Sequence, residues 1–543
     1  MGGLRHFCVW FFRTVLSALP LFLIYGHPLQ AVPPLADRAN PQSPVCRINQ
    51  DAYQNRLAAL SLAKTGFAPP IAPSTYKIAV IRIDFADKPM SKTLEETASV
   101  LSSFKSFYLE NSYGNLTLNP TVSPIFRMPH NHSYYAHGVL SAYDALAEDA
   151  VKTASDNGFD FTPYDQIILY HAGDGAETTN DGNLWSVYLP SDYLNGPKTQ
   201  GKAFPGLTLV PETEGNGVVP LGVLCHEYGH QMGLPDLYNT ANSQSVVGVW
   251  SLMDYGAYSG YPRGGNPSHL DAWSKQFLGF SAPETVPLSG NLNRALHSAE
   301  SERSAFLRVP VSNSPVGGDK EYFLVEYRSK STGSYDKALP AEGVLIWHID
   351  DSIASDPRRL QNNSVNAGFP NMGVHLVPAG SFASASSERD PWSPVNGARF
   401  ASPKNNNFTG KTSGVEIDGI SPAGGPSVSM VIRNFLGNPA FAANGAATRV
   451  VIAGGEGGFV NPGRGETAQI GLFPEKTESI KIRITNAGGE LVAEQSALGN
   501  ANSQSFVSWD GRDQEGRGVA SGIYFVKVEG GGIDTVKKVA VVK

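Results

Sequence analysis

The sequence predicts a multidomain protein: an α+β domain, then a β-rich region, and an all-β unit at the C-terminus. The chain has 543 residues, too many for one hydrophobic core. Helical spacing of apolar residues occurs between strand patterns before residue 284, whereas only strand patterns recur after it. Residues 435–448 (FLGNPAFAANGAAT) are rich in small side chains, which is typical of a linker.

The composition describes a folded protein that has no electrostatic preference for polyanions. Hydrophobic residues make up 41% and charged residues 17% of the chain, as in globular proteins and unlike disordered ones. The net charge of −7 gives no basis for binding nucleic acid or acidic lipid. We therefore expect neither as a partner.

The first 31 residues have the pattern of a secretory signal peptide. Basic residues precede an apolar run over residues 15–25, and the small residue Ala31 offers a cleavage point. The alternative is a membrane anchor, but the run is shorter than the roughly 20 residues that a spanning helix needs. We expect export, followed by a Pro-rich pro-segment over residues 32–75.

Cysteine usage argues against a disulfide scaffold. The chain has three cysteines, Cys8, Cys46 and Cys225, and the first lies in the predicted signal peptide. The two remaining cysteines can form at most one disulfide bond, so the stability of the fold must depend on its hydrophobic core. Cys46 lies in the predicted pro-segment, where its thiolate could occupy an open metal position and keep a precursor inactive. An ordinary exposed or paired thiol is the alternative.

The first domain is predicted to begin with a strand at Tyr76. Apolar residues spaced three and four apart predict helices over residues 94–110 and 142–157. Residues 166–170 (QIILY) predict a buried strand, followed by a Gly-rich acidic segment over residues 171–177. A strand before a metal-binding helix often forms the rim of a cleft and pairs with peptide substrate, although a surface loop fits equally. The acidic residues here could also hold Ca²⁺, which prefers oxygen ligands.

The most informative stretch, residues 221–238, reads LGVLCHEYGHQMGLPDLY. His226 and His230 are four residues apart, so a helix places both imidazoles on one face, as a Zn²⁺ site requires. Glu227 lies at a neighbouring angle, within reach of a water beside the metal. The alternative is a buried amphipathic helix with two satisfied histidines, and the surrounding pattern decides against it.

The residues after this helix predict a third ligand. Gly233 permits the left-handed turn that ends a helix, and Pro235 prevents its continuation. The reversed chain can then bring Asp236 back to the metal. Three protein ligands with one open position are typical of catalytic zinc, whereas structural sites usually have four ligands.

Only strand patterns follow, in two groups. Residues 284–434 contain four predicted strands and form a β-rich region that we expect to be continuous with the first domain: 306–309, 322–327, 343–348 and 428–432. Residues 449–543 contain five, with turns between them: 479–486, 489–492, 505–509, 522–529 and 535–542.

The string HEYGHQMGLPDLY…VGVWSLMDYG resembles the immune inhibitor A-type secreted metalloproteases, also called cholerilysins. The likeness extends over residues 76–434 and includes residues 78–87, 111–114, 267–279, 321–328 and 343–350. The segment SLMDY, residues 251–255, resembles the Met-turn of the metzincin metalloproteases. That resemblance implies that Tyr255 is a hydrogen-bond donor to the oxyanion; a core or solvent-facing tyrosine is the alternative. Metzincins usually have a histidine as third ligand, so a more distant carboxylate could replace Asp236 in that role.

The C-terminal string VSWDGRDQEGRGVASGIYFVKV resembles the Ig-like domain of the flagellar hook-capping protein, which implies an Ig-like β-sandwich. Such units serve as sorting signals, surface attachments or spacers. The predicted organisation is then a signal peptide (1–31), a pro-segment (32–75), a metzincin-like zinc protease domain (76–283), a β-rich region (284–434), a linker (435–448) and an Ig-like sandwich (449–543).

Together these features predict a secreted zinc endopeptidase that acts on proteins or peptides as a monomer. His226, His230 and Asp236 would bind zinc, and Glu227 would act as general base and acid. A contact with the cell surface or the secretion machinery would involve the C-terminal domain. Two other hypotheses about the function remain open. One is an inactive protease-like surface binding protein, and the other is a zinc hydrolase with non-peptide substrates.

Overall fold

The computed structural model describes residues 48–543 except 53, 56–73, 137–139, 180–181, 191–197, 287–289, 312–313, 315, 317–319, 369–371, 381–385, 402, 411–412, 435–449, 454–458, 465–466, 473 and 500–504. The predicted signal peptide, Cys46 and the predicted linker lie outside the described residues. Among the described helices, none is both long and apolar enough to cross a membrane.

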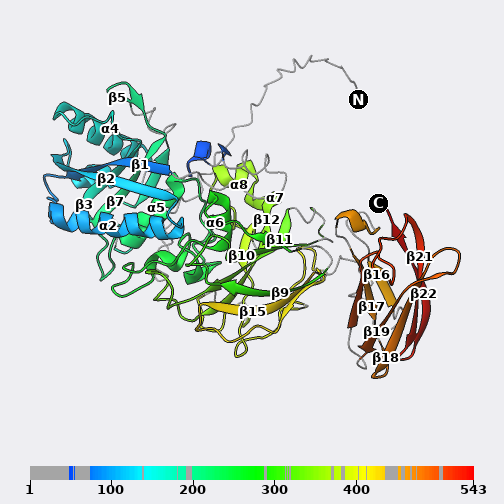
Figure 1. The fold of residues 1–543 in the computed structure, drawn as a ribbon. Helices are drawn as coiled ribbons and strands as arrows, with labels where there is room; N and C mark the ends of the chain where they lie inside the picture. Colours follow the sequence, from blue (N-terminus) through cyan, green and yellow to red (C-terminus); the bar gives the residue numbers. More distant parts are fainter. Residues whose placement is uncertain are drawn as a thin grey trace, which may run out of the picture.

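The N-terminal lobe is built on a five-stranded sheet (Figure 1). Its strands, in spatial order, are β2 (Leu116–Arg127), β1 (Ser74–Asp84), β3 (Gln166–Asp174), β7 (Gly206–Thr213) and β4 (Val187–Pro190). The first four run parallel, and β4 pairs antiparallel with β7. Beyond this sheet, the two-residue strands β5 (Lys198–Thr199) and β6 (Lys202–Ala203) form a small ribbon.

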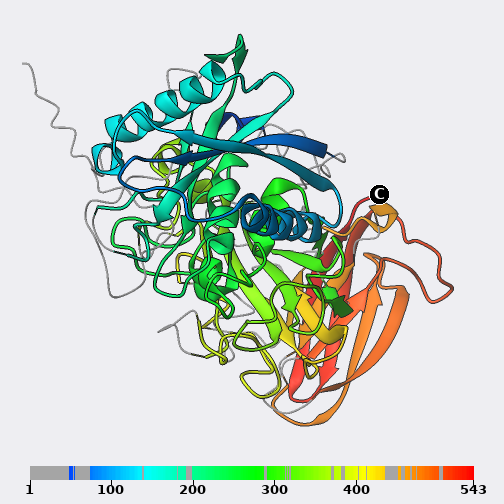
Figure 2. The same cartoon turned by 90° about the vertical axis from the view of Figure 1, so that its left-hand side faces the viewer.

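Helices cover both faces of this sheet. The long helices are α2 (Leu94–Asn111), α4 (Leu140–Asp156) and α5 (Leu221–Gln231), and the short ones are α3 (His132–Tyr135) and α6 (Ala272–Leu278). Alternate residues of β1 point to opposite sides: Ile78 packs in one core with Phe104 of α2, and Ala79 packs in another with Leu146 of α4. Figure 2 shows α2 (blue) and α4 (cyan) on opposite sides of the sheet.

Two sequence expectations need correction here. The lobe was expected to be α+β, but its sheet is mixed and mainly parallel, with helices on both faces, so it is an α/β fold. A strand over residues 166–170 was a candidate for the cleft rim. In the structure this strand, β3, pairs with β1 on one side and β7 on the other, which leaves no edge for a substrate. The outermost strand on that side of the described sheet is β4.

The β-rich region packs directly against this lobe. Its larger sheet has the order β13 (Val374–Leu376), β12 (Gly343–Asp350), β11 (Glu321–Arg328), β10 (Phe306–Pro310) and β8 (Glu284–Thr285). A second sheet contains β14 (Val415–Asp418), β15 (Ser427–Asn434) and β9 (Gly290–His297). Leu324 of β11 belongs to the core that includes α5, whereas its neighbours Phe323 and Val325 pack between the two sheets. Two short helices, α7 (Asp351–Ala354) and α8 (Pro357–Gln361), follow β12.

The C-terminal unit is a sandwich of two antiparallel sheets with its own core (Figure 1, orange to red). One sheet contains β16 (Val450–Ala453), β17 (Ala468–Leu472) and β20 (Ser505–Trp509); the other contains β19 (Leu491–Gly499), β18 (Glu478–Thr485), β21 (Gly522–Gly530) and β22 (Ile533–Val541). The 3-10 turn η3 (Pro462–Arg464) precedes β17. Trp509 is buried in this core, as expected of a structural anchor.

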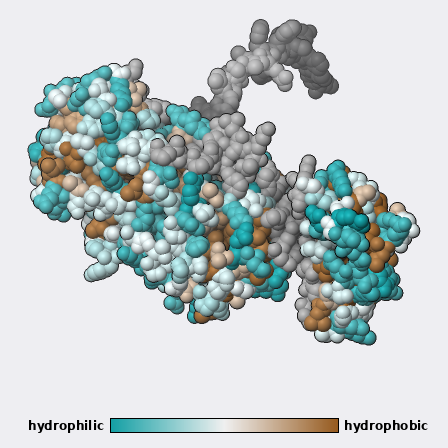
Figure 3. Space-filling model, in the orientation of Figure 1, coloured by the Kyte–Doolittle hydropathy of each residue, from teal (hydrophilic) through white to brown (hydrophobic). Residues whose placement is uncertain are grey.

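The described surface is mixed in character. Figure 3 shows hydrophilic and hydrophobic residues interspersed on the visible face, with the hydrophobic ones in small groups. The largest exposed apolar side chains come from separate elements, among them Leu94 in α2, Ile125 in β2 and Leu498 in β19. Scattered exposure of this kind is normal for a folded domain.

Candidate metal centre

The helix that carries the histidines, α5, is buried along its whole length. It lies between the sheet and the 3-10 turn η2 (Tyr255–Tyr258), and η2 in turn contacts η1 (Gly248–Trp250). Gly233 has φ +95°, the left-handed conformation expected at this helix end. Gly229 faces Met253: a Cβ at Gly229 would lie 2.8 Å from the methionine Sδ. The methionine of the predicted Met-turn therefore lies directly against the helix segment between the two histidines.

Backbone carbonyls fix the orientation of both imidazoles. His226 Nδ1 lies 2.8 Å from the carbonyl oxygen of Leu252, and His230 Nδ1 lies 2.8 Å from that of Leu234. A carbonyl oxygen can only accept, so each Nδ1 donates a proton to it, and Nε2 is the nitrogen that each imidazole can offer to a metal. This is the arrangement in which histidines ligate a metal.

Asp236 meets both histidines at one point. Its Oδ1 lies 3.0 Å from His226 Nε2 and 3.4 Å from His230 Nε2. Ligands about 2.0–2.1 Å from a tetrahedral zinc ion are separated from each other by about 3.3 Å. The two nitrogens and the oxygen therefore have the spacing of three ligands on one ion. His230 Nε2 is buried and has no hydrogen-bond partner of good geometry, which fits an atom reserved for a metal.

Asn363 holds Asp236 in place from the β-rich region. Its side-chain Nδ2 donates to Asp236 Oδ2 over 2.5 Å, and its side-chain Oδ1 accepts the backbone N–H of Asp236 over 2.8 Å. Asn363 is buried and follows α8, 127 residues after Asp236. The sequence analysis missed this residue, because no local pattern connects it with the histidine motif.

The charges at this centre support one another. Burial lowers the pKa of the His230 imidazole, but the carboxylate of Asp236 outweighs it and raises this pKa to about 9. In the opposite sense, burial raises the pKa of Asp236, and His230 and His226 outweigh it so that the pKa is lowered. Asp236 is thus held as the anion that a metal ligand must be.

Glu227 completes the group of titratable side chains. Its carboxylate and the two imidazoles each offer one atom, and these atoms lie within 4.8 Å of one another. Glu227 is fully buried, as are both histidines. A carboxylate beside the metal, not held as its third ligand, can take a proton from a water molecule there.

The predicted Met-turn is organised by a buried carboxylate that the sequence analysis did not single out. Asp254 Oδ2 accepts the backbone N–H groups of Val246, Val247 and Gly248, and its Oδ1 accepts that of Tyr255. The ring of Tyr255 is half-buried and lies 6.2 Å from that of Tyr258. The role of its hydroxyl as an oxyanion donor thus continues to depend on the metzincin resemblance.

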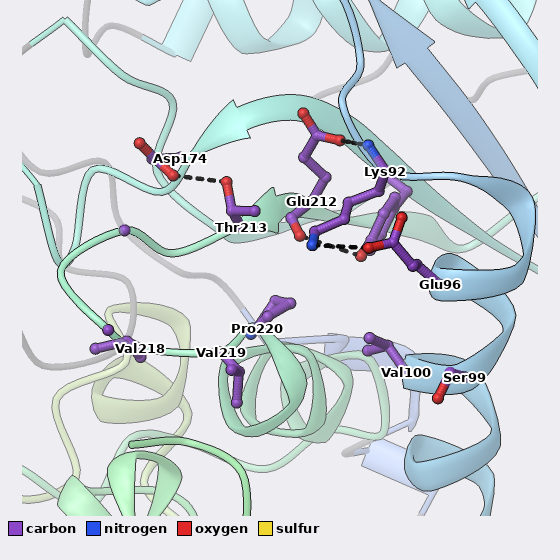
Figure 4. Close-up of a pocket in the computed structure, with 13 residues that line it drawn as sticks. Lys92, Glu96, Ser99, Val100, Asp174, Glu212, Thr213, Val218, Val219 and Pro220 are labelled. Carbon is purple, nitrogen blue, oxygen red and sulfur yellow. Dashed lines mark hydrogen bonds and ion pairs between the residues drawn. The ribbon is translucent and has the colours of Figure 1, made fainter. Parts of the chain in front are cut away.

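A cavity of about 510 Å³ lies beside the start of α5, away from the histidines. Its lining includes Lys92 and Glu96 near the start of α2, Asp174 and Glu212 near the ends of β3 and β7, and Pro220. Figure 4 shows these side chains, with Glu212 bonded to the backbone at Lys92 and Asp174 bonded to Thr213. No residue of the candidate metal centre lines it, so the cavity is separate from that centre.

Comparison with known proteins agrees with this geometry. Residues 185–282 match the family model "Immune inhibitor A peptidase M6, catalytic domain". This segment of the chain is similar to that catalytic domain. The matched residues include the whole candidate centre except Asn363. A second model, "FlgD Ig-like domain", matches residues 462–532 in the C-terminal sandwich.

Individual relatives cover only parts of the chain. Immune inhibitor A of Bacillus thuringiensis subsp. alesti is 28% identical over 243 residues, which is 36% of this chain and 34% of that protein. Pre-pro-metalloprotease PrtV of Vibrio cholerae serotype O1 is 44% identical over 59 residues, 10% of this chain and 6% of that protein. The chain thus covers about a third of the first relative and far less of the second.

Among solved structures, metalloproteinase-II from Bacteroides fragilis overlaps 41% of this chain and 60% of its own, at 18% identity and a TM-score of 0.24. That TM-score is too low to support an inference about fold.

Proposed function

We propose that this protein is a secreted zinc endopeptidase that hydrolyses peptide bonds in proteins. One observation carries the proposal: His226, His230 and Asp236 present two Nε2 atoms and one carboxylate oxygen at ligand spacing, with both Nδ1 atoms committed to backbone carbonyls. The match of residues 185–282 to a peptidase domain supports it. The intact donor set does not favour an inactive binding protein.

In this proposal each side chain has a defined task. His226, His230 and Asp236 bind the metal, and the carbonyls of Leu252 and Leu234 keep the imidazoles in the required tautomer. A bound zinc ion supplies Lewis acidity that makes water a nucleophile near neutral pH. The Glu227 carboxylate takes the proton of the attacking water and delivers it to the nitrogen of the leaving amine. The Tyr255 hydroxyl donates to the oxyanion.

The remaining domains extend the proposal. We assign the protease unit to residues 76–283, with residues 284–434 as its β-rich support, because Asn363 reaches Asp236 from that support. Residues 1–31 would direct export, residues 32–75 would be a pro-segment, and the C-terminal sandwich would sort or attach the protein.

The test compares purified wild type with Glu227→Gln. Zinc content is measured by mass spectrometry, and casein cleavage is followed with and without a chelator. We expect one zinc per chain in both proteins. Cleavage should be chelator-sensitive in the wild type and reduced by about 10²–10⁴-fold in the variant, the usual contribution of a general base.

A matched control is Glu212→Gln, which removes a buried carboxylate of β7 that contacts backbone N–H groups. It should retain both zinc and cleavage once folded. Normal cleavage by Glu227→Gln, or a wild type that binds no zinc, would contradict the proposal.

A further inference from the structure

A second group of buried oxygen atoms lies near the proposed metal centre, around Gly175. We call Glu177, Ser186, Glu214 and Tyr258 the Gly175 cluster. Glu177 and Glu214 follow the C-terminal ends of the neighbouring parallel strands β3 and β7, and Tyr258 ends the turn η2. All four side chains are at most 4% exposed. The sequence analysis named the acidic residues that follow β3 as possible Ca²⁺ ligands, without identifying Glu214 or Tyr258 as their neighbours.

The two carboxylates converge on one point. A Cβ placed on Gly175 would lie 2.4 Å from Glu177 Oε2 and 2.5 Å from Glu214 Oε2. Only glycine leaves room for both oxygens there. The two anionic groups therefore face each other across a space that one small ion could bridge.

Several oxygens of this cluster have no hydrogen-bond partner. These are Glu177 Oε2, Glu214 Oε1, Ser186 Oγ and Tyr258 Oη. The bonds that the two carboxylates do accept come from neutral groups, the backbone N–H of Ser186 and the hydroxyl of Thr178. Among the described residues, neither carboxylate forms an ion pair with Lys, Arg or His. Buried carboxylates of this kind are costly unless a cation or a proton compensates them.

The electrostatics of the cluster agree with a missing positive charge. Burial, with the Glu227 charge in addition, raises the pKa of Glu177 to about 7. Burial and the charge of Glu177 raise the pKa of Glu214 well above its ordinary value. Burial and the charges of both glutamates raise the pKa of the Tyr258 phenol.

The chemistry of the donors selects among ligands. All are oxygens, which suits a hard cation and not zinc, for which nitrogen or sulfur donors are typical. Full burial of both carboxylates argues for a resident ion and against the basic side chain of a passing substrate. Ca²⁺ binds 6–8 oxygens in flexible geometry, and water molecules can be among them. Four protein oxygens can therefore form part of its coordination shell, with waters as the remaining ligands.

We propose that the Gly175 cluster binds one Ca²⁺ ion, through Glu177 and Glu214 with Ser186 and Tyr258 beside them. This site is separate from the zinc ligands and is independent of the proposed peptidase activity. It would hold the loop after β3 against the end of β7 and against the turn that follows Met253.

Terbium(III) luminescence tests the site directly in the full-length, zinc-saturated protein. Tb³⁺ takes the ligands that Ca²⁺ takes, and the indole of Trp185, the chain neighbour of Ser186, should sensitise its emission. We expect a saturable signal that Ca²⁺ displaces and added Zn²⁺ does not. The melting temperature of the wild type should also rise by about 4 °C or more in saturating Ca²⁺.

Isosteric variants identify the ligands. Glu177→Gln and Glu214→Gln should each weaken Tb³⁺ binding by about tenfold or more, because the number of ligand charges sets the affinity of calcium sites. Without added Ca²⁺ they should melt no lower than the wild type, because each removes a charge that lacks a partner. Glu212→Gln is the matched control: its carboxylate is bonded to backbone N–H groups, so Tb³⁺ binding should be unchanged.

Two results would overturn the proposal. If the wild type shows no saturable Tb³⁺ signal and no Ca²⁺-dependent rise in melting temperature, a shared proton compensates the pair instead. If both variants keep the full signal, the ion binds elsewhere. Zinc content is measured on the same samples, so failure of the calcium site is distinguishable from failure of the zinc site. The wild-type titration alone decides the first point if a variant does not fold.

Discussion

Two buried acidic groups in this protein are compensated in different ways. In the first, which we call the Arg328 network, the carboxylates of Glu300, Glu326 and Asp336 surround the guanidinium of Arg328, and all four side chains are fully buried. Arg328 Nη2 lies 2.5 Å from Asp336 Oδ2. In the second, the Gly175 cluster, two glutamates face each other, and among the residues that the structure describes no Lys, Arg or His forms an ion pair with either.

The two clusters differ in the source of the positive charge that compensates their carboxylates. In the Arg328 network the chain supplies its own positive charge, and Arg328 lowers the pKa of Asp336 although burial would raise it. Burial still raises the pKa values of Glu300 and Glu326, the other two carboxylates of this network. In the Gly175 cluster burial raises the pKa values of both carboxyl groups, and no cationic side chain lowers either of them. Asp236 is a third case, with two imidazoles and Asn363 as partners. Each case predicts a different response to loss of one partner.

The largest effect on stability is expected for Arg328→Met. Removal of the guanidinium leaves buried carboxylates without compensation, and breaking a buried ion pair in this way costs about 3–5 kcal/mol. Urea denaturation measures this loss. Lys152→Met removes an exposed partner of Asp156 and should leave the unfolding midpoint in place. Equal unfolding midpoints for the wild type and Arg328→Met would show that the carboxylates of the Arg328 network do not need the guanidinium for stability.

The next effect concerns zinc affinity. Asn363→Ala removes both hydrogen bonds to Asp236, and loss of such a ligand-orienting partner typically weakens metal binding by about 10–100-fold. Competition with a chromophoric chelator gives the affinity. Asn405→Ala, which removes another buried amide far from the motif, is the control. Equal zinc affinity in the wild type and Asn363→Ala would show that Asp236 needs no support from the β-rich region.

A smaller, pH-dependent effect is expected for Glu110, which joins α2 to His269 and to the backbone of Ser334 and Tyr335. Burial raises its pKa, but these partners outweigh burial and lower it from 4.5 to about 2. The stabilisation is therefore complete above pH 4.5 and is lost as the pH falls toward 2.

Glu110 is partly exposed, so solvent screening reduces this contribution to about 1–2 kcal/mol. Glu110→Gln should lower the melting temperature at pH 7 and flatten its dependence on pH below 4.5. Parallel melting curves of the two proteins across this range would show that Glu110 gains nothing from its partners.

The smallest effect is expected for Met253→Leu, a change of shape at nearly constant volume that usually costs less than about 1.5 kcal/mol. The leucine would face Gly229, where the methionine Sδ now lies. Zinc should be retained and the melting temperature should fall by a few degrees. Loss of zinc from this variant would mean that Met253 shapes the centre by more than packing.

The sequence predicted those features that depend on neighbours along the chain. The helix with His226 and His230 depends on local spacing, and the turn at Gly233 depends on one residue's conformational freedom. Helices α2 and α4 were predicted to within two residues at each end. The same applies to most strands of the C-terminal sandwich, where turn residues mark the boundaries.

Contacts between distant segments could not be predicted in this way. Asn363 reaches Asp236 across 127 residues, and Glu177 meets Glu214 only because β3 and β7 are parallel neighbours. The parallel pairing also made the lobe α/β instead of α+β, since a strand's own pattern does not reveal its partners. The four-residue strand β4 was too short for its pattern to be recognised.

The identity of the metal ligands is the central claim, and anomalous diffraction at the zinc edge tests it most directly. Crystals of the zinc-loaded protein should show one strong peak about 2.0–2.2 Å from His226 Nε2, His230 Nε2 and Asp236 Oδ1. Glu227 should lie beside the peak without being its third protein ligand. A peak held by a different carboxylate, or no peak between the two histidines, would contradict the account.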